Sequence, residues 1–316
     1  MKTIFNTSTD PRFNLALEEY LLKYKVLDTD LFYLWRNQPS IIVGRNQNPF
    51  LEVYLKQCDR YNIPVIRRIS GGGTVYHDLG NINFTYITND LKRTNDYLFF
   101  LAPIISTLNH LGLNVKFVPK THLYQDEYKI SGNAQSVHKR RLIHHGTLLF
   151  STNQKILKQL LRKPKNTSNS VTSTPAKTKN IKDFLFIESN IEDFMDYIRE
   201  SIILDDVTHS ELLLTDKDYS VINQLKKDKY DTFDWNLGAN ASFKTIKLVN
   251  QSRVTFYINK GRIKDASCNN LVLQTFLKNT LHNTPLDYSV LQKKTKKLST
   301  VVKDTEKLIK KLAFHS

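Results

Sequence analysis

Cysteine, glycine and long apolar runs are all scarce in this sequence. Cysteine occurs only at Cys58 and Cys268, far apart and in unrelated contexts. Two such residues provide neither a disulfide framework nor a Cys-x-x-Cys metal or redox motif, and they favour a reducing cytoplasm as the setting. No apolar run approaches the roughly 18 residues that a membrane span needs, and the N-terminal MKTIFNTSTD lacks the apolar core of a signal peptide. The sequence therefore predicts a cytoplasmic protein that does not enter a membrane.

The charge is strongly unbalanced in the basic direction. Lys and Arg number 46 against 30 Asp and Glu, which leaves a formal net charge of +16. With 40% hydrophobic and 24% charged residues the composition is otherwise that of an ordinary globular protein, and 316 residues leave room for two domains. A charge excess of this size creates a long-range field that favours acidic partners, among which nucleic acid, a nucleotide and an acidic protein all remain open.

Hydrophobic periodicity predicts a mixed succession of helices and strands. Asp10 is placed to cap a helix that Pro11 opens and that ends near Lys25. The apolar runs at 31–35 and 40–44 are predicted to be paired strands. Further helices are predicted at 50–61, 95–111 and 153–162, and further strands at 114–118 and 141–150. Because the strict βαβ alternation of a parallel doubly wound fold is missing, we expect an α+β protein.

The C-terminal part is predicted to form a small α+β domain at 246–316, hinged near 240–246 to a large domain at 1–243. Strands in this part turn at Asn259–Lys260–Gly261, and helices are predicted near 270–280, 286–296 and 299–313. Residues 290–316 carry eight lysines, and the apolar residues from Leu298 to Leu312 follow helical spacing, so these lysines are interpreted mainly as a solvated helix face. Within the large domain, residues 164–180 have almost no large apolar side chains, which predicts a mobile loop.

Three of the ten glycines stand side by side in RRISGGGTVYHDLGN at 67–81. Adjacent residues without Cβ let backbone N–H groups approach an anion closely, and Arg67 and Arg68 add planar donors that suit phosphate or carboxylate. A flexible turn is the alternative interpretation of such a run. The flanking PVIRR and NINFTYI have the length and composition of strands, so the glycines are predicted to form a loop between ordered strands.

Three further segments are informative when they are taken together with this glycine-rich run. These are DPRFNLALEEYLL at 10–22, LWRNQPSIIVGRNQNP at 34–49 and KISGNAQSVHKRRLIHHGTLLF at 129–150. In this order and at these separations, the four segments resemble the lipoate–protein ligase family, over about residues 8–150 and more loosely to DWNLG at 234–238. The resemblance implies a large domain with a mixed or antiparallel sheet. It also implies ATP-dependent activation of lipoate as lipoyl-AMP, followed by transfer to lysine on acidic lipoyl domains such as dehydrogenase E2 subunits and the glycine-cleavage H protein.

The same resemblance implies roles for individual residues. Lys129 is expected to be the catalytic cation that reaches both the acyl carbonyl and the α-phosphate. The other residues expected to bind ATP or the adenylate are Arg68, Gly73, Thr74, Val75 and Tyr76, and those expected to bind lipoate, with Lys129, are Gly71, Gly72 and His77. His77 stands next to Asp78, but adenylation needs little proton transfer, which favours a positioning role for this histidine.

Two departures from the family pattern concern the nucleotide. Residues 173–181, STPAKTKNI, align with a loop that closes over the adenylate in the family, but Lys177 stands where arginine is usual. Thr121 and His122 occupy the place of a usual Asn-Asp pair before Lys129. Mg²⁺ is still expected because it arrives with ATP, and its protein ligands stay unassigned. His144 and His145 are adjacent on a predicted strand, point to opposite faces, and cannot chelate one ion from there.

Three alternatives remain. An octanoyltransferase or lipoyl amidotransferase of the same superfamily would form an acyl-enzyme on a cysteine, although neither Cys58 nor Cys268 lies near the KISG segment in sequence. Biotin ligases share the adenylating chemistry but carry a GRGRxG type of loop. A basic, non-enzymatic module for nucleic acid is suggested by the charge alone, without a recognised motif. The interpretation we favour is a monomeric ligase with ATP and lipoate as substrates.

Overall fold

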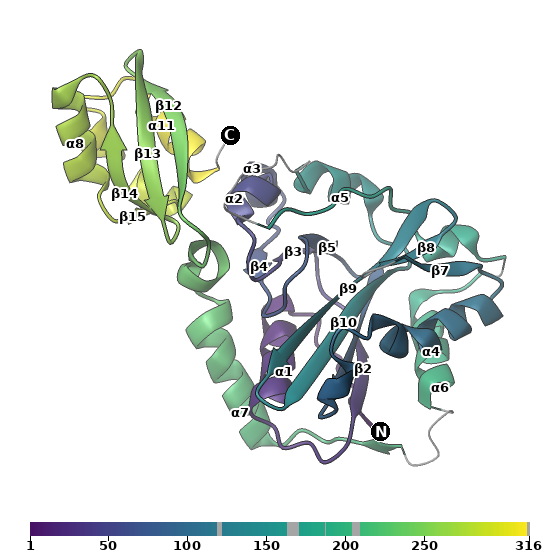
Figure 1. Ribbon diagram of the computed structural model, residues 1–316. Coiled ribbons are helices and arrows are strands. Elements are labelled where there is room, and N and C mark those ends of the chain that lie inside the picture. Colours follow the sequence, from purple (N-terminus) through teal and green to yellow (C-terminus); the bar gives the residue numbers. More distant parts are fainter. Residues whose placement is uncertain (119–121, 163–170, 187, 204–208, 315–316) are drawn as a thin grey trace.

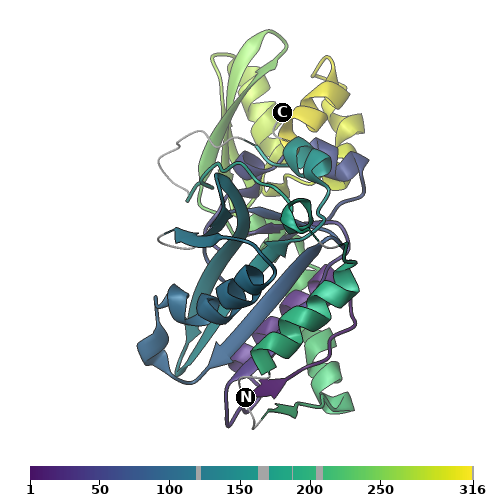
Figure 2. The same ribbon diagram turned by 90° about the vertical axis from the view of Figure 1, so that its right-hand side faces the viewer.

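The computed structural model describes residues 1–118, 122–162, 171–186, 188–203 and 209–314, and in these residues the strands form three sheets (Figure 1). The largest is a mixed sheet of eight strands with helices on both of its faces (Figures 1 and 2). This confirms the predicted α+β class with a large mixed sheet. In spatial order its strands are β11 (Ser210–Glu211), β1 (Lys2–Thr3), β2 (Leu31–Trp35), β6 (Asn81–Thr88), β10 (Arg141–Leu149), β9 (Tyr128–His138), β8 (His122–Gln125) and β7 (Val115–Val118).

Both faces of the central strands are buried. Along β2, Leu31, Tyr33 and Trp35 join one apolar core, while Phe32 and Leu34 join the other. This follows from the pleat of a strand, and it explains why the run LFYLW is apolar throughout instead of alternating. The first core is closed by helices α1 (Pro11–Lys23) and α7 (Asp216–Leu225), and the second by α4 (Tyr97–His110) and α6 (Ile191–Ile203).

Helix α1 begins as the sequence predicted. The Asp10 side chain accepts a hydrogen bond from an amide of the first turn, and Pro11 occupies the first turn, where its missing N–H costs nothing. The helix ends at Lys23. Two glutamates of α1, Glu18 and Glu19, are buried together with its apolar side chains. Each of them must therefore find partners inside the protein.

A second sheet, of three strands, carries the glycine-rich segment. Its order is β4 (Val65–Arg67), β3 (Ser40–Val43) and β5 (Val75–His77), with β3 parallel to β4 and antiparallel to β5. Residues 68–74, which we call the glycine loop, connect β4 to β5. The predicted flanking strands are present as β4 and β6, whereas the short strand β5 between them was not predicted. The predicted pairing of the strands at 31–35 and 40–44 is wrong. Strand β2 already pairs with β1 on one edge and β6 on the other, which leaves no edge for β3.

The predicted helix at 50–61 is interrupted. It forms α2 (Pro49–Glu52) and α3 (Leu55–Arg60), which are separated where Val53 makes an isolated bridge with Leu161. The predicted helices at 95–111 and 153–162 are present as α4 and α5 (Gln154–Leu160). Shorter helical turns are η1 (Leu91–Arg93), η2 (Ile181–Phe184), η3 (Lys226–Tyr230) and η4 (Asp234–Gly238), the last two being π-helical.

The C-terminal part contains the third sheet. Its strands are β12 (Phe243–Val249), β13 (Ser252–Asn259), β14 (Arg262–Ser267) and β15 (Thr284–Pro285). Lys260 and Gly261 form the predicted turn between β13 and β14 with positive φ angles of 49° and 65°. The sheet packs against helices α8 (Leu271–Leu281), α9 (Tyr288–Gln292), α10 (Thr295–Leu298) and α11 (Thr305–Ala313).

The last two predicted helices are shorter than expected. The segment 286–296 contains only the short α9 and the start of α10, and the segment 299–313 becomes helical only after Asp304, which has a left-handed backbone with φ of 52°. That conformation stops a single long helix from forming. The apolar spacing persists across the break because Leu298, Val302 and Leu308 all face the same core. The boundary between the two predicted domains stays a prediction.

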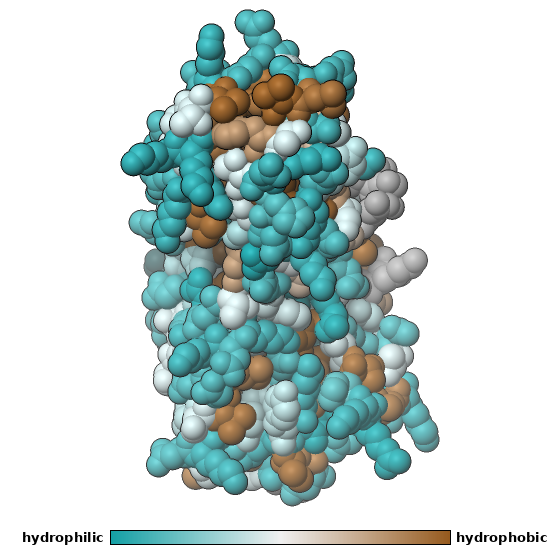
Figure 3. Space-filling view, turned by 90° about the vertical axis from the view of Figure 1, so that its left-hand side faces the viewer, coloured by the Kyte–Doolittle hydropathy of each residue, from teal (hydrophilic) through white to brown (hydrophobic). Residues whose placement is uncertain are grey.

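One face of the molecule is mostly hydrophilic but has a group of apolar side chains at its top, over the C-terminal part (Figure 3). Leu271 and Val272, at the start of α8, are among the strongly exposed apolar residues of the chain. Among the helices of the described residues, none has the length and apolar character to cross a membrane.

Candidate active site

A cavity of about 300 Å³ lies where the glycine loop meets strands β6, β9 and β10 of the large sheet. Most of the residues that the sequence singled out line this cavity. Gly71 and Tyr76 are not among its lining residues, and Tyr76 joins the core under α2 and α3. The predicted residues in the wall are Arg68, Gly72, Gly73, Thr74, Val75, His77 and Lys129.

The glycine loop is shaped by Arg68. Its guanidinium donates hydrogen bonds to the carbonyl oxygens of Gly71 at 2.5 Å and Gly73 at 2.8 Å, and so brackets Gly72 between them. Gly72 has a φ of 84°, which glycine adopts far more readily than other residues. Burial lowers the pKa of Arg68 to about 10, so the side chain still carries its charge at neutral pH. Arg68 therefore places a fixed positive charge in the cavity wall.

The other arginine of the pair has a different task. Arg67 is completely buried, and its guanidinium donates to the carbonyl oxygens of Gly44, Arg45 and Gln47 and to those of Trp235 and Asn236. It joins the segment after β3 to η4 near the start of the C-terminal part. Most guanidinium donors of both arginines are thus used inside the protein, and the binding of a phosphate group by Arg68 stays a prediction. Their donors are largely used by backbone carbonyls, because five carbonyls converge on one side chain and two of the loop's own carbonyls converge on the other.

Lys129 lies at the start of the long strand β9 and reaches the cavity from the sheet. A Cβ on Gly132 would lie 3.0 Å from the Lys129 Nζ, so the glycine of KISG leaves the space that the lysine side chain occupies. Burial, and then the positive charge of Arg68, lower the pKa of Lys129 to about 8. No described acidic residue forms an ion pair with this ammonium group. Lys129 is therefore a cation that an anionic ligand can neutralise.

His77 faces the cavity as a neutral donor. Asn14 donates to the Oδ1 of Asn37, which turns the Nδ2 of Asn37 toward the Nδ1 of His77 at 3.1 Å. The proton of the imidazole must then be on Nε2, and this buried atom has no partner among the described residues. Burial, followed by the charge of Arg68, lowers the pKa of His77 to about 3. This histidine positions by donation and is not poised for proton transfer at neutral pH.

A second buried donor lies in the same wall. Asn83 on β6 accepts a hydrogen bond at its Oδ1 from Asn81, which leaves its Nδ2 without a partner among the described residues. Asn83 stands opposite Trp35 on one neighbouring strand and Thr147 on the other, and all three line the cavity. Two buried N–H groups without acceptors indicate that the cavity is built for a ligand that carries oxygen acceptors.

The segment 171–174 covers the glycine loop. The Ser173 hydroxyl donates to Glu52 at 2.6 Å and accepts hydrogen bonds from the Gln47 side chain and from the Thr74 amide, each at 3.0 Å. Burial raises the pKa of Glu52. Backbone bonds also join Lys129 to Lys177 and Lys179. The described end of the predicted mobile loop thus lies against both main parts of the cavity, whereas residues 164–170 are outside the described residues.

A second, larger cleft of about 1050 Å³ lies beside the C-terminal sheet and meets the first cavity at Val171. Its wall is basic. Arg262 is paired with Asp234 at 2.7 Å, whereas Arg45, Lys260 and Lys264 form no ion pair with a described residue. The other residues along this cleft are Asn46, Gly238, Ala239, Asn240, Ala241 and Asn283.

The comparisons with known proteins agree with this geometry. Residues 10–203 match the model of the lipoyl protein ligase A/B catalytic domain. The lipoate–protein ligase 1 of Staphylococcus aureus is 39% identical over 247 residues, which cover 77% of this chain and 75% of that protein.

The chain belongs to the lipoate–protein ligase family.

Solved structures support the assignment of the chain to this family. A lipoate–protein ligase A bound with ATP matches with a TM-score of 0.65 and 26% identity, over 75% of this chain and 98% of that one. The protein Ta0514 from Thermoplasma acidophilum, described as a putative lipoate protein ligase with bound lipoic acid, matches with a TM-score of 0.64 and 25% identity, over 75% and 99% of the two chains.

The cysteines of the ligase are away from the cavity. Cys58 is buried in the core beneath the second sheet, where burial raises the pKa of its thiol to about 12. Cys268 lies after β14, and its thiol donates to the carbonyl of Asn270. His144 and His145 point to opposite faces of β10, as predicted. His144 stacks on Phe100, while His145 faces Glu18.

Several polar residues of the site were not identified from the sequence. Glu18, Gln47, Glu52 and Asn83 are buried and either line the cavity or hold its loops. Glu18, Glu52 and Asn83 share one signal, a charged or amide side chain inside an apolar run, as in LALEEY around Glu18, whereas Gln47 lies in the polar segment GRNQNP. A buried carboxylate requires partners, so this pattern indicates a polar network even where it cannot indicate the partners. Thr121, which the sequence comparison singled out, lies outside the described residues, and His122 lines the cavity.

Proposed function

We propose that this ligase activates lipoate with ATP and then transfers the lipoyl group to a lysine of an acceptor domain. In the first step a carboxylate oxygen of lipoate attacks the α-phosphorus. The bond from that phosphorus to pyrophosphate breaks, and lipoyl-AMP forms. In the second step the neutral amine of the acceptor lysine attacks the acyl carbonyl carbon, AMP leaves, and the nitrogen loses a proton to become an amide.

One observation carries this proposal: a single cavity brings together the Lys129 ammonium, the charge of Arg68 and the glycine loop. Adenylation increases negative charge around the α-phosphate while pyrophosphate departs, and fixed positive groups in a water-poor site stabilise that charge without having to reorganise. Lys129 suits this task because its lowered pKa reflects an ammonium group that burial disfavours and that no described carboxylate compensates. A bound anion compensates the charge of this ammonium group.

The two buried donors support a site for the acyl group beside Lys129. The Nε2–H of His77 and the Nδ2 of Asn83 can donate to the carboxylate of lipoate and then to the acyl carbonyl. The apolar wall beyond them includes Leu15, Trp35 and Ile42, which suits an aliphatic tail. Gly73, Thr74 and Val75, together with Ser173, are proposed to contact the nucleotide. Gly71 and Tyr76 act only through the fold of the loop and strand.

The absence of a thiol from the cavity wall argues against the acyl-enzyme alternative. An octanoyltransferase of this superfamily needs a cysteine thiolate next to the acyl carbonyl. Both cysteines of the chain are described, and neither lines the cavity. The buried Cys58, whose pKa is raised to about 12, is unsuited to forming a thiolate at neutral pH.

The basic cleft supports an acidic acceptor. Arg45, Lys260 and Lys264 present positive charge within the cleft that meets the cavity at Val171. We propose that it receives acidic lipoyl domains, including those of dehydrogenase E2 subunits and the H protein, and that a cytoplasmic monomer performs both steps. The same charge gives no specific support to nucleic-acid binding.

Mg²⁺ is proposed to enter with ATP. The described residues contain no group of three or more His, Cys, Asp or Glu side chains that could hold a metal ion. Mg²⁺ commonly keeps several waters and phosphate oxygens as ligands, so a nucleotide-borne ion needs few protein ligands. We therefore assign it no residue of this chain.

Incubation of the protein with lipoate, Mg·ATP and an apo lipoyl domain tests the proposal. The expected result is an acceptor that gains the mass of one lipoyl group, with release of pyrophosphate that depends on lipoate. Purified lipoyl-AMP should replace lipoate and ATP together. Transfer from an acylated carrier protein without ATP, or a thioester on the enzyme, would favour the acyltransferase. Salt-sensitive binding to DNA or RNA without lipoate-dependent pyrophosphate release would favour the nucleic-acid module.

A further inference from the structure

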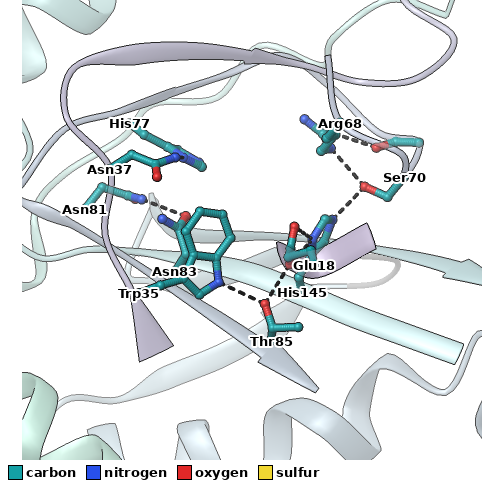
Figure 4. A network of polar contacts seen from close by, with 11 residues as sticks. Glu18, Trp35, Asn37, Arg68, Ser70, His77, Asn81, Asn83, Thr85 and His145 are labelled. Atoms are coloured by element: carbon teal, nitrogen blue, oxygen red, sulfur yellow. Dashed lines mark hydrogen bonds and ion pairs between the residues drawn. The ribbon is translucent and has the colours of Figure 1, made fainter. Parts of the chain in front are cut away.

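A chain of hydrogen bonds connects Arg68 to the buried carboxylate of Glu18 (Figure 4). The Nε of Arg68 donates to the Ser70 hydroxyl at 3.0 Å, and this hydroxyl lies 2.6 Å from the Nε2 of His145. The Nδ1 of His145 lies 2.9 Å from one carboxylate oxygen of Glu18 and 3.1 Å from the other. Glu18 and Ser70 are both inaccessible to solvent. Four side chains from α1, β10 and the glycine loop thus form one continuous path.

The donors in this path all point toward Glu18. Thr85 donates to the same carboxylate at 2.6 Å, and Trp35 in turn donates to the Thr85 hydroxyl at 2.9 Å. An ionised Glu18 accepts from His145 Nδ1–H, which leaves Nε2 to accept the Ser70 proton, while the Ser70 oxygen accepts from Arg68. In this single arrangement every contact of the path has one donor and one acceptor. It runs from a guanidinium at one end to a carboxylate at the other.

The path balances two buried charges that do not touch. No ion pair joins Arg68 to an acidic residue among the described parts of the chain, and a buried charge without compensation is costly. The polarised chain through Ser70 and His145 supplies that compensation over a distance that a direct ion pair would not span. Glu18 is therefore the counter-charge of the arginine that brackets Gly72.

We propose that Glu18 and His145 are positioning residues that hold Arg68, and through it the glycine loop, in the arrangement needed for adenylate formation. The two carbonyl bonds from Arg68 to Gly71 and Gly73 set the course of the loop. Loss of the counter-charge frees the guanidinium to rotate and releases these carbonyls. The expected effect on catalysis rests on the proposed adenylation, whereas the expected effect on the structure of the glycine loop does not.

Two other roles of the same residues predict different behaviour. Ser70, His145 and Glu18 have the geometry of a nucleophilic triad, but Ser70 is fully buried, does not line the cavity, and already accepts a bond from Arg68. Glu18 and His145 do line the cavity, so they can also act as simple wall contacts for the acyl tail. A wall contact changes the KM for lipoate, whereas positioning of Arg68 changes kcat of adenylation.

The first test uses the ligand-free protein. Glu18→Gln keeps the size of the side chain and removes its charge. The matched control is Glu19→Gln, which removes the neighbouring buried carboxylate of the same helix, where Glu19 pairs with Lys23 and Lys229 away from the path. Amide hydrogen exchange in residues 69–75 should rise about tenfold in Glu18→Gln and stay near wild type in Glu19→Gln. Equal exchange in the two variants would overturn the proposal, even if the wild type proves to have no lipoate-dependent activity.

The second test separates positioning from wall contact by lipoate-dependent ATP–pyrophosphate exchange. Glu18→Gln and His145→Phe should each lower kcat about ten- to hundredfold while the KM for lipoate changes by less than about threefold. His145→Gln retains both a donor and an acceptor and should recover most of the lost kcat. A change confined to KM would assign both residues to the wall of the acyl site and reject the positioning role.

The third test asks whether Glu18 acts through Arg68. In an Arg68→Met background, Glu18→Gln should cause less than about a twofold further loss of kcat, because coupled residues are non-additive. Losses that multiply would show that the two residues act separately. Labelling of Ser70 by a fluorophosphonate would instead reveal a nucleophile and overturn the assignment. If Arg68→Met does not fold, the hydrogen-exchange and His145→Gln measurements still test the positioning role.

Discussion

The small cavity at the glycine loop and the larger, more open cleft beside the C-terminal sheet are lined by positive charge in different ways. In the cavity, of about 300 Å³, backbone carbonyls hold Arg68, and burial lowers the pKa of Lys129 to about 8. In the cleft, of about 1050 Å³, Arg45, Lys260 and Lys264 stand around a wider space without carboxylate partners among the described residues. Short-range contacts in the cavity suit chemistry on a small molecule, while charges that water and salt can reach suit attraction of a partner.

The largest expected effect concerns Lys129, a cation in the wall of the cavity. Lys129→Ala should slow lipoate-dependent pyrophosphate release by roughly 10²–10³, by analogy with the loss of one preorganised donor to a developing charge. The variant should remain folded because Lys129 is only half-buried. Circular dichroism provides the control for folding. A rate within threefold of wild type in a folded variant would remove Lys129 from the reaction.

The adjacent glycines allow a graded test of the cavity wall. Gly72→Val should abolish binding of lipoyl-adenylate, because φ is 84° and an added Cβ would lie 3.0 Å from the Arg68 guanidinium. Gly71→Ala is the matched control, since no atom lies within 4 Å of the added Cβ, and it should bind nearly as well as wild type. Calorimetry with the intermediate measures both. Equal affinities for the two variants would mean that the loop is only a turn.

The protonation of Lys129 gives a pH dependence. Its pKa of about 8 lies below the ordinary lysine value, so the ammonium group is present at pH 7 and is lost as the pH rises through 8. Adenylation should therefore fall about tenfold between pH 7 and pH 9. Lys129→Arg keeps its charge over this range and should show no such decline. A decline of the same size in the variant would assign the titration to another group, whatever its absolute rate.

The cleft should respond to salt and charge more than the cavity does. Raising salt from about 0.05 to 0.5 M should lower the second-order rate constant of lipoyl transfer much more than the rate of adenylation at saturating substrates. The pair Arg45→Glu and Lys264→Glu should weaken transfer several-fold, by slower association. The control pair Lys303→Glu and Lys307→Glu has the same change in net charge but lies outside the cleft. Equal losses from both pairs would show a general field and no acceptor site.

The smallest effect is expected for the thiols. A Cys58→Ser and Cys268→Ser double variant should retain ligation within a few-fold, because neither residue lines the cavity. Cys58 is buried, so the variant can lose about 1–3 kcal/mol of stability by burying a hydroxyl. Thermal unfolding separates that loss from catalysis. Inactivity of a folded double variant would return the acyl-enzyme mechanism to consideration.

Local sequence patterns were sufficient to predict the structural elements that depend on residues close together in the sequence. The Asp10–Pro11 start of α1, the Lys260–Gly261 turn and the glycine loop after β4 all follow from caps, turn residues and apolar periodicity. Strand pairing was not predictable in the same way, because β2 and β3 read alike but belong to different sheets. The edge along which a strand pairs depends on which edges of the neighbouring strands are already occupied by other strands.

The sequence by itself determined the basic charge, the α+β class, the clustering of glycines and the family-like order of four segments, because each of these is a property of local composition and spacing. Only the tertiary structure decided what the polar residues of those segments do. Arg67 and Arg68 are adjacent and chemically identical, yet one joins η4 to the segment after β3 and the other brackets Gly72. Their different roles arise because hydrogen-bond partners come from distant parts of the chain, and the sequence of a segment carries no record of which carbonyls or carboxylates the fold will bring to it.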